Sequence, residues 1–139
     1  METTSFTTMQ IILGGLLGGL FINLCDVTVT VTTVAKKWNA VLESQGLKPS
    51  PFTPPYYVSA SFIAGIILAW TITVISAKYG MTRQTALIAS LHLFAISRLY
   101  GAGHVVMGQM PIKIFSIMSF GLLLGFIAGG QIIYWYLTK

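Results

Sequence analysis

The stretch that decides the fold is Gly14–Asp26, which reads GGLLGGLFINLCD, an apolar run with four glycines at helical spacing and an acid at its end. The glycines form two pairs spaced by four residues, Gly14 with Gly18 and Gly15 with Gly19. Such pairs strip the side chains from one face of a helix and let a second helix approach closely. An aspartate inside an apolar segment is costly unless it has a partner. The stretch therefore predicts a membrane-spanning helix that packs through glycines and holds Asp26 against a polar group.

The composition of the chain is that of a membrane protein. Of its 139 residues, 55% are hydrophobic and only 8% are charged, whereas about 25% of a soluble domain is charged. A chain of this length cannot bury so much apolar surface from water, so we expect residues 1–139 to form one domain surrounded by lipid. The net charge of +5 comes from basic residues scattered at segment ends. That distribution is typical of contacts with lipid headgroups rather than with nucleic acid.

Four apolar segments are near or above the ~20 residues that a helix needs to cross a bilayer. They span about residues 9–34, 56–77, 85–107 and 112–137. An interfacial extension at 36–45 and a proline-rich linker at 46–55 separate the first two, and short turns at 78–83 and 108–111 separate the others. Short connections favour antiparallel neighbours. The sequence thus predicts an all-α, up-down bundle of four transmembrane helices with both termini on one side of the membrane.

The segment Val27–Val34 alternates valine and threonine, a period of two that is typical of a strand. A lone strand in lipid would leave its backbone groups unpaired. We therefore predict that the helix continues through this segment. Threonine hydroxyls that bond to the preceding turn would allow a bend there.

The positive charges do not fix the orientation of the bundle. Three basic residues lie at the end that holds both termini, and four lie at the other end. The basic turn at 78–83 favours cytoplasmic termini. Aromatic residues mark both ends as interfacial belts, with Tyr134, Trp135 and Tyr136 at one end and Trp38, Tyr56 and Tyr57 at the other.

Two charged residues lie well inside the apolar segments, Asp26 in the first and Arg98 in the third. At 1.5 Å per residue, Asp26 lies about 25 Å and Arg98 about 21 Å from the same side. We expect the two to form a charge pair between the first and third spans, with Asn23 and Tyr100 nearby. Together with His104, the pair suggests a proton or ion path. A polar clasp that fixes helix register is the favoured interpretation, because transport normally needs several polar groups along a path.

Both histidines lie on the third span, twelve residues apart. His92 and His104 are then about 18 Å apart along the axis, too far to share one metal ion. Each could bind a haem or chlorophyll alone, and His92 is deep enough for that role. A hydrogen-bonded packing role is the more common one for a lone histidine in a bundle. No cluster of histidine, cysteine and acidic residues predicts a metal site.

The fourth span carries a second glycine row, formed by Gly121, Gly125 and Gly129. This row lies about 3 to 15 Å, and the first-span glycines about 7 to 15 Å, from the side that holds the termini, so the two rows share a layer. We expect the first and fourth spans to pack face to face through these rows. Alternatively, one row stays open for a neighbouring subunit, a lipid tail or a flat pigment.

The chain lacks the motifs of the common enzyme classes, including phosphate loops, nucleophile elbows and zinc signatures. Only three acidic residues are present, too few for a carboxylate pair in the membrane core. We therefore expect no enzyme activity and assign no catalytic residue.

The order of features along the chain resembles small four-span bacterial integral membrane proteins to which no activity is assigned. The resemblance rests on the glycine-rich opening that ends at Asn23, the acid Asp26, Trp38 before a polar linker, and three further spans. It implies a bacterial inner-membrane location and brings no activity.

Three hypotheses of function follow. We favour an accessory or structural subunit that packs against other proteins of a larger membrane complex. The first alternative is a component of a small proton, ion or solute transporter that uses Asp26 and Arg98. The second alternative is a carrier of haem or chlorophyll that binds through His92 or His104.

Overall fold

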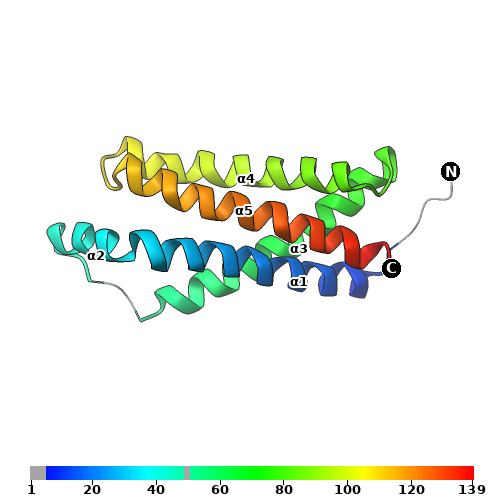
Figure 1. Cartoon of the computed structure of the whole chain (residues 1–139), viewed down its shortest axis with the longest axis horizontal. Coiled ribbons are helices and arrows are strands. Elements are labelled where there is room, and N and C mark those ends of the chain that lie inside the picture. Colours follow the sequence, from blue (N-terminus) through cyan, green and yellow to red (C-terminus); the bar gives the residue numbers. More distant parts are fainter. Residues whose placement is uncertain (1–5, 49–50) are drawn as a thin grey trace.

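A computed structural model describes residues 6–48 and 51–139. The described residues form helices and no strand, and four of the helices are long and apolar enough to cross a membrane (Figure 1). The helices are α1 (Thr8–Val29), the π-helix η1 (Thr30–Val34), α2 (Ala35–Ser44), α3 (Thr53–Tyr79), α4 (Arg83–Val106) and α5 (Ile112–Leu137). The prediction of an all-α, four-span, up-down membrane bundle is confirmed, and α1 begins at the end of the bundle where α5 finishes.

Local sequence signals set where the helices begin. Thr7 and Gln10 cap α1 reciprocally, because Gln10 N donates to Thr7 Oγ1 at 3.2 Å and Thr7 N donates to Gln10 Oε1 at 2.9 Å. Helix α3 begins at Thr53, so Pro54 and Pro55 lie in its first turn rather than in a linker. Proline is tolerated there because the first amide groups of a helix have no intrahelical partner.

Helix α1 lies at the centre of the packing and contacts α3 on one side and α5 on the other. Helix α4 packs against α5 and, less extensively, against α3. The four spans therefore form a ring in the order α1, α3, α4, α5. In this ring α1 and α4 occupy opposite corners.

Glycine pairs on α1 bring its backbone close to both neighbours. Gly15 and Gly19 face α3, where a Cβ atom on Gly65 would overlap the backbone of both. Gly14 and Gly18 instead face α5, where a Cβ atom on Gly18 would lie 2.5 Å from Ile133 Cδ1. Adjacent residues point about 100° apart on a helix, so the two pairs serve two faces rather than the single face expected from the sequence.

The glycine row of α5 packs against the C-terminal half of α1, from Gly18 to Val29. A Cβ atom on Gly129 would lie 2.8 Å from Gly18 O, one on Gly125 would lie 2.9 Å from Ile22 O, and one on Gly121 would lie 2.7 Å from Val29 Cβ. These distances are shorter than real Cβ contacts, so the row can hold only glycine at this separation. Both glycine rows are therefore covered within the chain.

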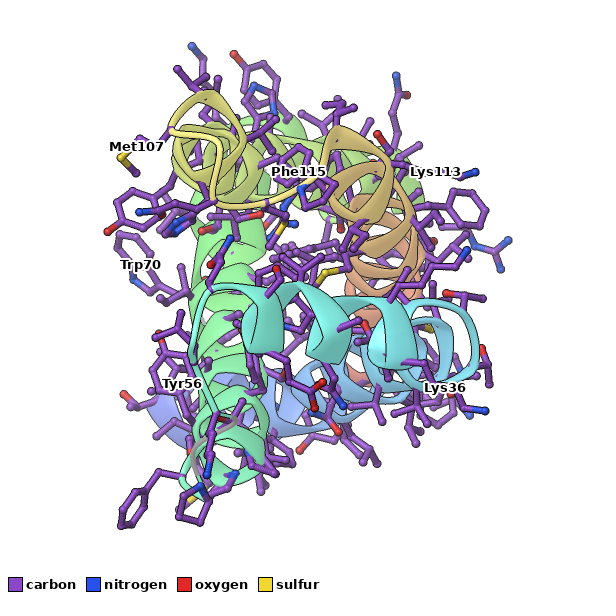
Figure 2. The ribbon with its side chains drawn as sticks, turned by 90° about the vertical axis from the view of Figure 1, so that its left-hand side faces the viewer. Lys36, Tyr56, Trp70, Met107, Lys113 and Phe115 are labelled. Carbon is purple, nitrogen blue, oxygen red and sulfur yellow. The ribbon has the colours of Figure 1, made fainter. Side chains whose placement is uncertain are left out.

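The valine–threonine segment after α1 is helical but wider than an α-helix. Thr32 Oγ1 donates to Thr28 O at 2.6 Å, and Thr33 Oγ1 donates to Val29 O. The π-helix that follows from Thr30 to Val34 redirects the chain, and α2 runs across the end of the bundle in Figure 2. A side chain that competes for the helical carbonyls and a π-bulge are both known causes of such a bend.

The interior is closed at one end and wide at the other. At the end where the termini lie, Gly80, with φ of 82°, begins a short turn that brings α3 against α4, and Ile72, Ala86 and Ile133 are fully buried. Towards the opposite end α3 crosses the bundle obliquely and diverges from α4 (Figure 1). We call these the closed end and the wide end.

The outer surface is apolar, as lipid requires. Large hydrophobic side chains on every spanning helix are exposed to the surroundings, including Leu24, Ile63, Leu99 and Phe120. Trp70, predicted to lie within the membrane, is 59% exposed and points away from the bundle (Figure 2). The chain is an integral membrane protein.

We predict that Gly65→Ala destabilises the bundle by about 3 kcal/mol, because the new methyl group would force α3 away from the α1 backbone. The measurement is equilibrium unfolding of the purified protein in mixed detergent micelles. Gly103→Ala is the matched control, since a Cβ atom there meets nothing within 4 Å. That control should be neutral or stabilising by up to about 1 kcal/mol, and equal stability of the two variants would contradict the close contact.

Candidate functional site

A cavity of about 370 Å³ lies inside the wide end, with walls from all four spanning helices. Apolar side chains form most of its surface, among them Ile22, Met118, Leu122 and Phe126. Its polar lining residues are Asp26, Tyr56, Tyr57, Ser61, Ser97, Arg98 and His104. An apolar cavity of this size with a few convergent polar groups is the usual form of a small-molecule site.

The packing of α1 against α3 positions Asp26. Asn23 Nδ2 donates to Ser61 Oγ at 3.4 Å, and Ser61 Oγ donates to Tyr57 O at 2.9 Å. Because α1 and α3 are antiparallel, one further turn along α1 corresponds to one turn back along α3. Asp26 therefore lies at the level of Tyr57, and the Tyr57 phenol interacts electrostatically with both Asp26 and Arg98.

Arg98 is held against α5. Its Nη1 donates a long hydrogen bond of 3.5 Å to Ser119 Oγ, and its Cζ lies 5.5 Å from the ring centroid of Phe115. A cation over an aromatic face gains electrostatic stabilisation. Its Nε is buried and has no hydrogen-bond partner within the described residues. The guanidinium, a permanent cation with five donors, is thus only partly satisfied by the protein.

The two charges line one cavity without touching. Within the described residues, no carboxylate oxygen lies within 4.0 Å of the Arg98 guanidinium, and the Asp26 carboxylate accepts no hydrogen bond. The direct charge pair expected from the sequence is therefore absent from the described contacts. The reason is topological, because α1 and α4 lie at opposite corners of the ring.

The structure separates the remaining polar residues that the sequence analysis grouped together. His104 lines the cavity, and its Nδ1 lies 2.8 Å from Gln109 Oε1 of the α4–α5 turn. Asn23 lies between α1 and α3 and supports Ser61 rather than lining the cavity. Tyr100 is 85% exposed on α4 and is not among the residues that line the cavity with Asp26.

His92 lies outside the cavity. Its side chain is exposed on the outer surface of α4, and its Nδ1 lies 2.8 Å from Ile88 O of the preceding turn. The two histidines are therefore on different surfaces. The part of the chain that the structure describes contains no group of three or more histidine, cysteine or acidic residues that could hold a metal ion.

Sequence reasoning missed four polar residues of the site, which are Tyr56, Tyr57, Ser61 and Ser97. Tyr57 was assigned to the aromatic belt because it lies near the start of its span. An antiparallel register between the first two spans would have placed it level with Asp26. Ser97, Gly101 and His104 line the cavity at a spacing of four and three residues, a helical stripe that could have been found by plotting the third span on a helical wheel.

In comparisons with known proteins, no family model, no curated protein and no solved structure matches the chain. The resemblance to small four-span bacterial membrane proteins stays a prediction.

We predict that water-soluble thiol reagents reach the cavity but not the closed end. In a Cys25→Ala background, Ser97→Cys should react at least about tenfold faster than Ser90→Cys, since reaction requires an accessible thiolate. Ser90 is the matched control for Ser97, because both serines lie on α4 and both donate to a carbonyl of the preceding turn. Ser97 lines the cavity, whereas Ser90 is fully buried. Equal labelling rates would show that the cavity is closed to water.

Proposed function

We propose that the protein binds a small charged solute in the cavity of the wide end. The observation that carries this proposal is Arg98, a cation inside the bundle that has no carboxylate partner among the described residues and lies on a cavity wall. Charged groups within membrane segments are costly and normally pair with an opposite charge. A bound anion would supply the missing partner.

The polar-clasp interpretation accounts for Arg98 less well. A clasp satisfies its own charges, because a buried ion left without its partner is strongly destabilising. Here the protein offers the guanidinium one long hydrogen bond, one aromatic face and the electrostatic attraction of Asp26, which makes no direct contact with it. The cavity beside it leaves room for a ligand to complete the set.

The closed end supports binding rather than conduction through the bundle. Beyond the cavity, the interior is filled by fully buried side chains such as Leu68, Ile72 and Ile133, and the glycine contacts hold α1 tightly against its neighbours. A solute that enters from the wide end meets this packed layer. A transporter component that uses Asp26 and Arg98 would have to separate α1 from α3 or α5.

We also propose that the chain lies in a bacterial inner membrane with cytoplasmic termini, as the basic turn between α3 and α4 favours. In that orientation the wide end and the cavity mouth face away from the cytoplasm. The ligand would then come from the outer side of that membrane or from its outer leaflet.

We predict that filling the cavity removes a co-purifying ligand. Ala60 lines the cavity on α3, whereas Ile63 is 58% exposed on the outside of the same helix. Native mass spectrometry after mild-detergent extraction should detect a small molecule on the parent protein and on the control Ile63→Phe. The same measurement should detect none on Ala60→Phe. Identical spectra for the two variants would contradict binding in the cavity.

A second candidate function, an accessory subunit of a larger membrane complex, is supported by His92. This residue lies about 14 Å along α4 from Arg83, at mid-membrane depth, and its side chain is exposed. A polar group that faces lipid at that depth is unfavourable. Its second ring nitrogen has no partner within residues 6–48 and 51–139, so a neighbouring subunit, a haem or a chlorophyll could use it.

We predict that His92→Leu disrupts such a complex. A tagged parent chain and an Ile63→Ala control should co-purify with stoichiometric partners from native membranes in mild detergent, while His92→Leu should lose them. Absorbance of the same fractions tests the pigment alternative, since haem or chlorophyll would colour the parent and not the variant. If the parent chain is isolated alone and colourless, the subunit function is wrong.

A further inference from the structure

We infer that the ligand of the cavity is a small zwitterion, with an anionic group at Arg98 and an ammonium group at Asp26. The inference rests on the proposed binding function and adds the chemical class of the ligand. Its basis is the separation of two opposite charges across one cavity. Both residues line the cavity, and the described contacts include no ion pair between them.

The charge balance of the lining favours a ligand with both signs. Asp26 contributes one negative charge to the lining and Arg98 one positive charge. A ligand with a single charge would neutralise one wall and leave the other unpaired in a medium of low dielectric constant, where unpaired charges are costly. A zwitterion neutralises both walls and leaves the net charge of the site unchanged.

The hydrogen-bonding groups agree with this assignment. Arg98 lines the cavity, and its guanidinium fork matches the two oxygens of a carboxylate or phosphate. On the opposite wall, Asp26 offers only acceptors, as an ammonium group requires. The hydroxyl of Ser97 already donates to Phe94 O at 2.8 Å, so its lone pairs remain as further acceptors.

Volume and apolar lining limit the body of the ligand. The cavity of about 370 Å³ corresponds to roughly a dozen waters at ~30 Å³ each, which suits a molecule of about a dozen non-hydrogen atoms. Phe115, Leu122 and Phe126 line the cavity with apolar surface. Phe115 lies on the inner side of α5, towards α4 (Figure 2).

Two kinds of molecule combine an ammonium group with an anionic group and occur near a membrane surface. One is a free amino acid with an apolar side chain, and the other is the ammonium–phosphate headgroup of an ethanolamine phospholipid. Tyr57 and Phe115 are four and three residues from the starts of their helices, which places the cavity about 5 Å below those helix ends. That depth is accessible both from water and from lipid headgroups.

The test compares ligands that differ by one charge on the full-length protein. The protein is reconstituted in phosphatidylglycerol nanodiscs, and calorimetry measures its affinity for leucine, for 4-methylpentanoate, which lacks the ammonium, and for isoamylamine, which lacks the carboxylate. In a second arm, phosphatidylethanolamine is titrated into the nanodiscs with phosphatidylglycerol alone as the control. We expect leucine or phosphatidylethanolamine to bind, and to bind at least about tenfold more tightly than its singly charged counterparts.

Variants assign the two charges to their walls. Asp26→Asn should abolish the preference for leucine over 4-methylpentanoate, and Arg98→Gln should abolish the preference over isoamylamine. The analogue series on the parent protein gives the same answer without any variant, so poor folding of a variant does not affect the conclusion. A singly charged analogue that binds as tightly as the zwitterion overturns this inference. So does the absence of binding by both zwitterions.

The two proposals fail in different ways. If native mass spectrometry shows a bound molecule that Ala60→Phe removes, yet single charges suffice for binding, the cavity function stands and the zwitterion is wrong. If Ala60→Phe and Ile63→Phe carry the same molecules, the cavity function itself is wrong.

Discussion

The close approach of the α1 backbone to two neighbours is the constraint on which the rest of the structure depends. Lipid provides no hydrophobic drive for helices to associate, so membrane bundles rely on packing and polar contacts. Helix α1 meets α3 through Gly15, Gly19 and Gly65, and it meets α5 through a separate set of glycines. These contacts fix the antiparallel registers of three helices at once. The polar pairing of Asn23 with Ser61 follows from the first of those registers.

The same contacts account for the cavity. Small residues hold α1, α3 and α5 together at the closed end, where Gly130 also receives Ser90 of α4. Helix α3 crosses the bundle obliquely, so its other half diverges from α4 (Figure 1). Larger side chains such as Phe115 and Phe126 line the resulting space without filling it. The cavity is therefore a consequence of tight packing at the opposite end of the same helices.

Much of the fold could be predicted from the sequence, because each span is long, apolar and bounded by turn residues. The helical state of the valine–threonine segment followed from the absence of strand partners in lipid. The order of the helices around the ring could not be predicted, because hydropathy gives the depth of a residue but not its neighbours. Asp26 and Arg98 illustrate the difference, since depth placed both at one level and the ring order keeps them apart.

The sequence analysis placed residues by their depth along a helix and did not consider the direction of each side chain around the helix axis. Tyr100 follows Arg98 by two residues, which turns it about 200° around the helix and directs it outward. Gly65 lies in a row of small residues, with Ser61 and Ala69 four residues away on either side, and all three are buried. A search for small residues, rather than for glycines alone, would have identified this row as a packing face.

The chain distributes its stabilising contacts unevenly, and this distribution bears on function. Most of the fully buried side chains lie at the closed end, whereas the glycine contacts extend from that end to Gly121, which packs on Val29 at the end of α1. At the wide end, α2 has no buried residue, and Gln45 Nε2 ties it to Gln109 O in the α4–α5 turn at 3.3 Å. Gln109 also contacts His104, which lines the cavity. Regions with few buried contacts open at lower free energy than the core, so a ligand can gain access to Asp26 and Arg98 without disturbing the glycine contacts that define the bundle.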